Sequence, residues 1–388
     1  MAETVETKEP RPLISGVRIE NFRSIPSAEV ELGRVTVVVG ANGSGKSNLL
    51  EAIAVAGAAA ADKLDHEFLA ARGIRPIEHA LVVPRFACDD TPEQARIAVG
   101  APLSLWEVSV RLQTDPRQSV FVGTNAIGGE SAIAQLRAAG DRLAAAVQGG
   151  ESIEAIRALH EEFMALFISG HPPGMTSFLI YAPEYTALRT FTDEGQILPL
   201  GVRGEGLFKH LVDLSRKSPE IVERIGEHLK VLDWFDGFVI PSDLGPGEKR
   251  LAIRDRYLAK DVLLDQRAAN EGFLFLLFVY TLLLSPDTPR FFAIDNADAS
   301  LNPLLCARVV ADIVELAREK DKQVILTTHN PALLDGLDLS DEEQRLLVCE
   351  RDLDGHTQFR RVPKPRDGTV RLSEAFLRGY LGGLPKSF

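Results

Sequence analysis

The chain has 388 residues, of which 45% are hydrophobic and 25% are charged, and its net charge is −12. This composition is typical of a globular protein with one large domain or two ordinary ones. The acidic balance argues against a surface built mainly to grip nucleic acid, although it leaves room for a local basic patch. The scattered cysteines Cys88, Cys306 and Cys349 lack metal-ligand spacing, so we expect reduced thiols in a cytoplasmic protein.

No run of apolar residues is long enough to span a bilayer, so we expect no membrane contact. The longest run, FLFLLFVYTLLL at 273–284, stops at Ser285-Pro286 and is typical of a buried helix. Residues 1–12 are charged and contain proline, and they lack the apolar core of a signal peptide. We expect them to form a disordered tail.

The first third of the chain predicts strands around one helix. LISGVRIENF at 13–22 alternates apolar and polar residues, and RVTVVVG at 34–40 is a continuous apolar run of the kind buried in a sheet. A helix is expected from Lys46 through an alanine-rich stretch to about Lys63. Further strands are expected at 81–87, 105–113 and 120–123, the last two as a hairpin.

Residues 126–175 differ in character from the rest and predict an inserted helical hairpin. Apolar residues keep helical spacing from 130 to 167, with a break at Gly149-Gly150. Two interpretations remain open. The helices either cover the sheet or form an arm for a partner or for dimerisation.

Strands and helices alternate again beyond residue 176. The predicted elements are a strand at 177–183, a helical stretch at 205–230, β structure at 237–258, a helix at 272–284, a strand at 290–295, a helix at 303–320, a strand at 323–329 and a hairpin turning at 352–355. This alternation at both ends predicts an α/β core. The core would consist of two lobes, 13–125 and 176–388, on either side of the insertion.

The stretch GANGSGKS at 40–47 fits the pattern G-x-x-x-x-G-K-[ST] of a phosphate-binding P-loop. It lies between a predicted strand and a predicted helix, as such a loop must. Backbone amides and the helix N-terminus supply partial positive charge, Lys46 adds a full charge, and Ser47 offers a hydroxyl to Mg²⁺. The predicted phosphate site comprises Gly40, Ala41, Asn42, Gly43, Ser44, Gly45, Lys46 and Ser47.

Two later strands end in residues that would complete such a site. Asp295 follows the apolar run FFAI, where a Mg²⁺-binding carboxylate is expected. His329 ends the next predicted strand, QVILTTH, at the edge where ligands bind in α/β sheets. The chain has no Asn-Lys-x-Asp guanine-binding motif, so these strands favour ATP over GTP as the nucleotide.

The P-loop, Asp295 and His329 in this order resemble ABC-type ATPases, in particular the heads of SMC, RecF and OLD-family proteins. The opening VRIENFRSIPSAEVELGRVTVVVGANGSGKSNLLEAI is similar to the start of such a head. DNADASL at 295–301 is similar to the SMC segment Asp-Glu-x-Asp-Ala-Ala-Leu, with Asn296 and Ser300 as departures. The resemblance implies an α/β P-loop NTPase, with an ABC-type head whose mixed central sheet is flanked by helices, and a helical insertion.

The same resemblance implies roles for individual residues. Asp295 and Ser47 would hold Mg²⁺, His329 would be the switch histidine that senses the γ-phosphate, and Asp298 would lie in the D-loop. Arg23, in Asn-Phe-Arg, matches a basic residue that reaches the nucleotide in related heads.

The family also carries a signature motif, usually Ser-x-Gly, at the start of the helix before the Asp strand. RAANEGF places Asn270 and Gly272 there, at a helix N-terminus that can face a γ-phosphate. In this family the signature of one subunit meets the P-loop of the other. The resemblance therefore implies a homodimer that closes around ATP.

Asn296 stands where the family carries a carboxylate that orients and polarises the attacking water. Removing a general base typically costs about 10²–10⁴ in rate, although a loose transition state makes early proton removal less critical. We therefore predict tight binding of ATP and Mg²⁺ with slow hydrolysis, and a catalytic set of Asp295, Asn296 and His329.

The segment after Pro331 is too short for the nuclease domain that OLD-family proteins append. Glu350, Asp352 and Asp354 fit a hairpin turn better than a metal cluster. We therefore expect a separate effector protein to supply nuclease or toxin activity, as in the antiphage defence operons where stand-alone ATPases ending like LSEAFLRGYLGGLP are often found. Two alternatives remain: a RecF-like DNA-repair ATPase that binds duplex DNA, and a nucleotide-gated scaffold without turnover.

Overall fold

The computed structural model describes residues 14–61, 63–75, 82–86, 92, 94–101, 104–112, 121–127, 140–147, 149, 152, 155–157, 159, 174–298, 301–364 and 370–384. The tail expected at 1–12 lies outside these residues. So does most of the helical hairpin expected between 130 and 167, of which 140–147 and 155–157 are helical.

The elements alternate as the sequence predicts. In chain order they are β1 (Gly16–Phe22), β2 (Ile25–Glu31), β3 (Val35–Val39), α1 (Lys46–Ala60), α2 (His66–Ala71), β4 (Gln94–Ala101), β5 (Ser104–Leu112), β6 (Phe121–Ile127), β7 (Ile180–Tyr181), α5 (Tyr185–Thr190), α6 (Leu207–Lys217), α7 (Pro219–Leu229), β8 (Phe235–Val239), β9 (Ala252–Asp255), β10 (Leu264–Asp265), α8 (Glu271–Leu284), β11 (Phe291–Ile294), α9 (Pro303–Glu319), β12 (Gln323–Thr328), η2 (Pro331–Gly336), β13 (Gln344–Arg351), β14 (Thr357–Arg361) and α10 (Leu372–Leu377).

The central sheet has the strand order β14-β13-β3-β12-β11-β7. All of its pairs are parallel except β13 with β14, which form an antiparallel hairpin. It joins β3 from the N-terminal part of the chain to strands that follow residue 176. Because β3, β12 and β11 are parallel neighbours, the segments that follow them meet at one edge of the sheet.

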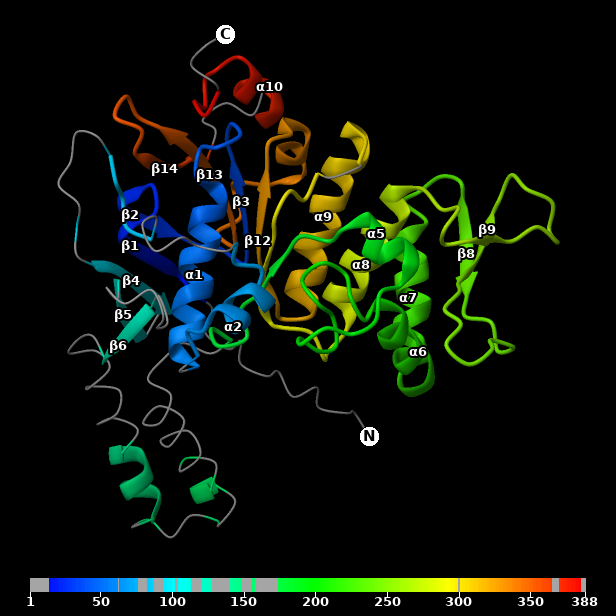
Figure 1. Ribbon diagram of the computed structural model, residues 1–388, viewed down its shortest axis with the longest axis horizontal. Helices are drawn as coiled ribbons and strands as arrows, with labels where there is room; N and C mark the ends of the chain where they lie inside the picture. Colours follow the sequence, from blue (N-terminus) through cyan, green and yellow to red (C-terminus); the bar gives the residue numbers. More distant parts are fainter. Residues whose placement is uncertain are drawn as a thin grey trace.

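Side chains of β3 alternate between two cores. Val35, Val37 and Val39 pack with α8 and α9, whereas Val38 packs with α1 and the strands β1, β2 and β4. Figure 1 shows α1 on one side of the central strands and α9 and α8 on the other. Helix α8 is buried from Gly272 to Leu284, as expected for a helix that is apolar all round.

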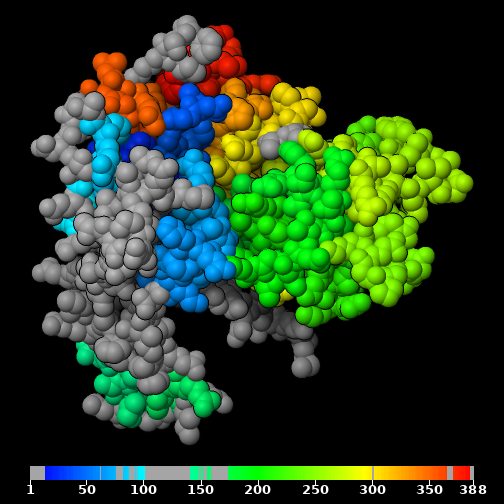
Figure 2. Space-filling view, in the orientation of Figure 1, coloured from blue at the N-terminus to red at the C-terminus, as the bar shows by residue number. Residues whose placement is uncertain are grey.

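Two antiparallel sheets flank this core. The first, in the order β2-β1-β4-β5-β6, lies beside α1, and the second, β10-β9-β8, projects beyond α7 at the right of Figure 1. The space-filling view shows the β8–β10 sheet as a separate protrusion of the surface (Figure 2). No helix in the described part of the chain is long and apolar enough to cross a membrane.

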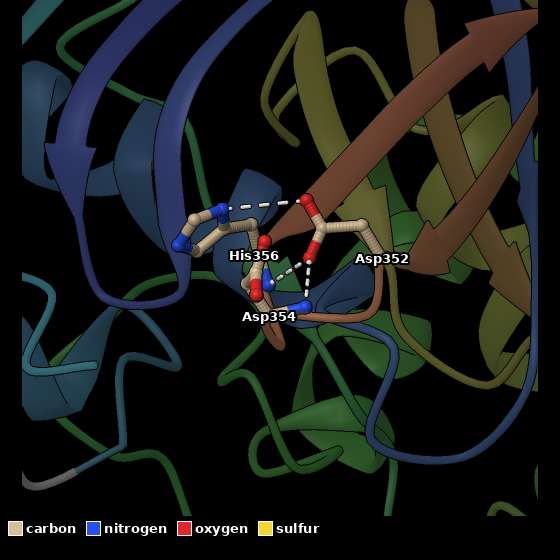
Figure 3. A group of neighbouring side chains, drawn as sticks. All are labelled: Asp352, Asp354 and His356. Atoms are coloured by element: carbon tan, nitrogen blue, oxygen red, sulfur yellow. Dashed lines mark hydrogen bonds and ion pairs between the residues drawn. The ribbon is translucent and has the colours of Figure 1, made fainter. Parts of the chain in front are cut away.

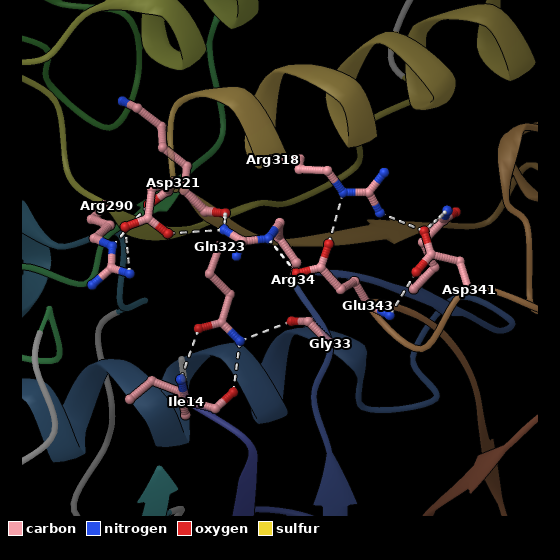
Figure 4. A network of polar contacts seen from close by, with 11 residues as sticks. Ile14, Gly33, Arg34, Arg290, Arg318, Asp321, Gln323, Asp341 and Glu343 are labelled. Carbon is pink, nitrogen blue, oxygen red and sulfur yellow. Dashed lines mark hydrogen bonds and ion pairs between the residues drawn. The ribbon is translucent and has the colours of Figure 1, made fainter. Parts of the chain in front are cut away.

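A polar network ties the sheet together at the edge opposite the P-loop (Figure 4). Arg34, just before β3, donates from Nη1 to Asp321 Oδ1 at 3.1 Å and from Nε to Glu343 Oε1 at 2.8 Å. Gln323, at the start of β12, accepts from Ile14 N at 3.1 Å and donates to Ile14 O at 2.7 Å. These contacts fix the amino ends of β3, β12 and β13 relative to one another.

Several sequence predictions were wrong in detail. The strand expected at 81–87 is not one over its described residues 82–86, because Pro84 cannot donate to a ladder. Strands β2 and β4 were not predicted, although Ala95, Ile97 and Val99 of β4 are buried in alternation. The strand expected at 177–183 shrinks to β7.

The expected helices also differ at their ends. The helical stretch predicted at 205–230 is two helices, α6 and α7, because Pro219 cannot continue α6 and instead starts α7. Helix α1 ends at Ala60 rather than near Lys63. The predicted boundaries of the two lobes and the insertion stay predictions.

Candidate nucleotide-binding site

The P-loop connects β3 to α1, as the motif predicts, and its two fixed glycines have no room for a side chain. A Cβ on Gly40 would lie 2.1 Å from the carbonyl oxygen of Cys349. A Cβ on Gly45 would lie 2.3 Å from Thr357 Oγ1, and Gly45 also has a φ of 111°. Both clashes come from the β13–β14 hairpin, so this hairpin forms a wall behind the loop.

A chain of hydroxyl contacts fastens the loop to that wall. Thr357 Oγ1 donates to the carbonyl of Ser44 at 2.8 Å. Ser24 Oγ lies 2.7 Å from Thr357 Oγ1, and Asn48 Nδ2 donates to Ser24 Oγ at 2.7 Å. The turn between β1 and β2, the hairpin and the first turn of α1 therefore hold the loop from three sides.

Lys46 lies inside the loop that it belongs to. Its Nζ donates to the carbonyls of Gly40 at 2.8 Å and Ala41 at 2.9 Å. Burial lowers the pKa of Lys46, while Cys349, Asp295 and Asp298 act in the opposite direction. A buried ammonium beside two carboxylates is the electrostatic setting that a polyphosphate chain with its divalent cation requires.

Ser47 and Asp295 meet across the sheet edge. Ser47 Oγ donates to Asp295 Oδ2 at 3.1 Å, and Thr327 Oγ1 donates to Asp295 Oδ1. The backbone amide of Asp295 donates to Tyr181 O at 2.8 Å, so β7 fixes the strand end as well. A hydroxyl and a carboxylate at this spacing, next to a P-loop, are hard oxygen donors of the kind that Mg²⁺ selects.

Asn296 follows Asp295 in a left-handed backbone conformation, with a φ of 55°. The backbone amide of Asn296 donates to Thr327 Oγ1 at 3.0 Å, and the residue is exposed. Asparagine tolerates this backbone region several-fold better than most residues. Asparagine is thus a residue type that suits this backbone position after Asp295.

Asp298 and His329, predicted to serve the D-loop and the switch, contact each other. His329 Nε2 lies 3.4 Å from Asp298 Oδ2, and Thr328 Oγ1 donates to Asp298 Oδ1 at 2.8 Å. The Asp298 side chain is 6% exposed, whereas that of His329 is 53% exposed. A movement of the His329 side chain would therefore change its contact with Asp298, in the loop that follows β11.

The signature candidates lie at the N-terminus of α8. Asn270 is the N-cap, and its Oδ1 accepts from Phe273 N at 2.8 Å. Asn270 is exposed and Gly272 is buried. Whether this helix end serves as a signature stays a prediction.

Sequence reasoning missed an arginine pair around Glu51. Glu51, one turn after Ser47 on α1, is only 2% exposed and lies 2.6 Å from Arg23 Nε and 2.7 Å from Arg75 Nε. Arg75 also donates to Asn48 Oδ1 at 3.2 Å, and its hydrogen bond with Glu51 raises its pKa. A carboxylate at helical spacing among apolar residues was the signal for buried cationic partners.

Arg23, which was predicted to reach the nucleotide, is largely buried against this carboxylate. Burial lowers the pKa of its guanidinium, while Glu51 raises it. Arg75 is the more open of the two, at 58% exposed, and the charge of Asp295 acts on it. Arg75 is thus a second cationic candidate for contact with phosphates.

The acidic group after β13 belongs to a hairpin turn, as predicted (Figure 3). Asp352 Oδ1 accepts from Asp354 N at 3.0 Å and from His356 N at 2.9 Å. His356 Nδ1 lies 3.3 Å from Asp352 Oδ2. These contacts of the Asp352 and His356 side chains shape the turn between β13 and β14.

Two stretches of the chain match family models. Residues 13–70 match the family described as "AAA ATPase domain". Residues 260–335 match the family described as "AAA domain, putative AbiEii toxin, Type IV TA system". The two stretches contain the P-loop, the start of α8, Asp295 and His329. No curated protein sequence matches the chain.

Solved SMC heads have a similar fold. The chain is similar to an Smc head bound to the C-terminal winged-helix domain of ScpA, with 17% identity, a TM-score of 0.55, and coverage of 91% of this chain and 98% of that one. An Smc head with an extended coiled coil from Pyrococcus furiosus, bound to the C-terminal domain of ScpA, has 15% identity and a TM-score of 0.50, with coverage of 91% of this chain and 96% of that one. An Smc head with a coiled coil and joint from Pyrococcus yayanosii has 13% identity and a TM-score of 0.51, with coverage of 95% of this chain and 99% of that one. The predicted fold class is confirmed.

Proposed function

We propose that this chain, an ABC-type ATPase head of the SMC-like class, binds ATP and Mg²⁺ between two copies of itself and controls a separate effector through the closed dimer. Hydrolysis would be slow and would time the release of the effector. The single observation that carries the proposal is the contact between Ser47 Oγ and Asp295 Oδ2, 3.1 Å apart beside Lys46.

The residues present fit the nucleotide and the metal. Gly40 and Gly45 let the loop pack directly on the β13–β14 hairpin, because no side chain fits at either position. The backbone amides of the loop would bind the phosphates. Mg²⁺, when bound, would neutralise charge on the phosphates and orient them. Ser47 and Asp295 would hold the metal, while Lys46 would neutralise the phosphate chain.

Support for a two-copy site comes from the position of the signature candidates. The N-terminus of α8 is exposed at Asn270 and offers amides with partial positive charge. A γ-phosphate held by one copy could be met by this helix end of a second copy. The D-loop residue Asp298, in contact with His329, would relay the presence of that phosphate to the dimer surface.

Slow turnover follows from the amide at position 296. Asn296 can hold a water beside Asp295 but cannot take its proton, and the loss of a general base typically costs about 10²–10⁴ in rate. The ATP-bound dimer would then persist, and its lifetime would be the signal. An effector nuclease or toxin in an antiphage defence operon is the partner that this timing suits.

The dimer is tested with two substitutions at one position. Asn270→Ser and Asn270→Asp both keep an N-cap for α8. Only the aspartate adds a negative charge facing a γ-phosphate, so we expect ATP-dependent dimerisation for the native chain and the serine variant and its loss for the aspartate variant. Sedimentation velocity with ATP and Mg²⁺ measures this. Equal dimerisation of all three chains would contradict the two-copy site.

The partner is tested by co-purification of tagged chain from its native cells with and without ATP. We expect a distinct protein to be retained only when ATP and Mg²⁺ are present. Retention of duplex DNA instead, sensitive to salt, would contradict effector control and favour a DNA-repair role.

A further inference from the structure

The C-terminal segment after α10 follows a path that its glycines dictate. Gly379, Gly382 and Gly383 have φ values of 75°, 71° and 78°. Other residues avoid this left-handed region, where they lose roughly 1 kcal/mol or more. The three glycines thus allow backbone turns that other residues would disfavour.

This segment ends on the P-loop. The amide of Ala41, the second residue of the loop, donates to the carbonyl of Gly383 at 3.1 Å. The amide of Gly383 donates in turn to Glu350 Oε2 of β13 at 3.1 Å. Both backbone groups of Gly383 are therefore used to join the loop to the hairpin. Figure 2 shows the red C-terminal segment against the blue residues that follow β3.

The position of Gly383 leaves no room for any other residue. A Cβ there would lie 2.7 Å from Val348 Cγ1 and 3.1 Å from Phe376 Cε2. Val348 and Phe376 are both buried in the core. Because neither neighbour can move away, a side chain at this position would displace the segment itself.

Helix α10, which precedes the segment, is fixed to the element that follows β12. Ser373, in α10, donates from N to Asp335 Oδ1 at 2.9 Å and from Oγ to Asp335 Oδ2 at 2.7 Å. Asp335 belongs to η2, which follows β12 and His329. Helix α10 and the segment after it thus connect η2 to Ala41 of the P-loop.

The tip of the loop borders open space. A cavity of about 190 Å³ lies between residues 41–44, the end of β13 and Gly383-Leu384. The hairpin holds the loop at Gly40 and Ser44, but the stretch between them borders this cavity. The carbonyl of Ala41 is bonded within the loop, to Lys46 Nζ at 2.9 Å, whereas its amide is bonded to Gly383 outside the loop.

We propose that residues 379–384 are a strap that holds the P-loop in its phosphate-binding shape, with Gly383 as a positioning residue. The strap would act on the nucleotide through Ala41, whose backbone amide it binds. This inference rests on the proposed function, since it concerns the affinity of the same nucleotide site. Without the strap the P-loop would sample other conformations. Ordering the loop on binding would then cost free energy and weaken the affinity for nucleotide.

The experiment compares Gly383→Ala with Gly247→Ala. Gly247 has a φ of 77°, and a Cβ there would meet no described atom within 4 Å, so the control carries the same backbone strain without moving the strap. The dissociation constants of ATP and ADP are measured with Mg²⁺, and the exchange of the Ala41 amide with solvent is followed by mass spectrometry. Glu350→Ala removes the acceptor of the Gly383 amide without adding atoms to the core.

We expect Gly383→Ala and Glu350→Ala to weaken both nucleotides about tenfold and to speed exchange at Ala41, whereas Gly247→Ala leaves both unchanged. Faster exchange at Ala41 with native affinity would overturn the strap. Unchanged exchange at Ala41 in Glu350→Ala would overturn it too. A native chain that binds neither nucleotide would instead overturn the proposed function, so the two failures are distinguishable.

Discussion

Ser47 Oγ lies 3.1 Å from Asp295 Oδ2, although 248 positions separate the two residues. The contact exists because β3 and β11 are parallel strands on either side of β12 and end at one edge of the sheet. A hydroxyl from the P-loop and a carboxylate from the late strand are thereby presented together. The remaining features of the site are arranged around this pair.

Removal of either member of the pair should uncouple nucleotide binding from Mg²⁺. With Ser47→Ala or Asp295→Asn we expect ATP to bind at least about tenfold more weakly in Mg²⁺, because a metal ligand is lost. In EDTA this loss should disappear, because no metal then joins these side chains to the phosphates. Isothermal titration calorimetry measures both conditions. Ser215→Ala, remote on α6, is the control, and an undiminished Mg²⁺ effect in both variants would contradict the assignment.

Two glycines of the P-loop should respond differently to the same substitution. Gly45→Ala places a Cβ 2.3 Å from Thr357 Oγ1, whereas on Gly43 the Cβ meets no described atom within 4 Å, and both positions have positive φ. We expect Gly45→Ala to abolish nucleotide binding and to destabilise the fold by about 2–4 kcal/mol, from overpacking added to backbone strain. Gly43→Ala should cost only about 1 kcal/mol.

Nucleotide titration and chemical denaturation distinguish the two glycine variants. Equal losses of nucleotide affinity and of stability in the Gly43 and Gly45 variants would mean that packing of the loop against the β13–β14 hairpin is not what excludes a side chain at Gly45. Lys46→Ala serves as the reference for a chain that has lost phosphate binding, since it removes the buried ammonium beside Gly40 and Ala41.

Lys322 should make stability depend on pH. Its Nζ donates to the carbonyls of Leu282 at 2.8 Å and Ser285 at 2.9 Å near the end of α8, and burial lowers its pKa to about 7 from 10.5. Between those values the unfolded chain holds a proton that the folded chain has released. Stability should therefore rise with pH across this window, by up to about 1.4 kcal/mol per unit from this group.

The matched variants are Lys322→Met, which removes the buried amine, and Lys320→Met, which removes a partly exposed neighbour. Denaturant unfolding from pH 7 to about 8.5 should show the rise in the native chain and in Lys320→Met, and a clearly smaller one in Lys322→Met. Above about pH 9 the thiols of Cys306 and Cys349 act in the opposite direction, because burial raises their pKa to about 11 from 9. Burial also lowers the pKa of His210 from 6.5, so its titration falls below this window. A native slope retained in Lys322→Met would contradict the assignment.

Much of the site could be predicted because its residues lie in local patterns. The P-loop has fixed spacing between a strand and a helix, and Asp295 and His329 end apolar strands. Parallel pairing then brings the three together. Helix α8 could also be predicted, because a helix that is apolar on all sides is stable in water only when it is buried in the core.

The rest of the site depends on contacts between distant segments, which leave little trace in a local pattern. Nothing near Gly45 indicates that Thr357 is its neighbour, and nothing near Ala41 indicates Gly383. Arg75 lies outside every motif, and its place beside Asn48 depends on where α2 ends. Strand β2 was missed because Ile-Pro-Ser-Ala has weak strand propensity, and pairing with β1 decides its conformation.

The central claim is that Asn296 sets how long ATP is held. Asn296→Glu restores a carboxylate beside Asp295, at a cost of about 1 kcal/mol for a glutamate at a φ of 55°. Asn296→Asp is the control for a carboxylate on a shorter side chain, in a residue type that tolerates this backbone.

The most direct measurement is single-turnover hydrolysis of ATP by the native chain and by Asn296→Glu, each in excess over ATP with Mg²⁺. We predict slow hydrolysis by the native chain and a rate about 10²–10⁴-fold higher with glutamate, the range expected for a restored general base. A native chain that already hydrolyses ATP rapidly, with no gain from glutamate, would contradict the claim.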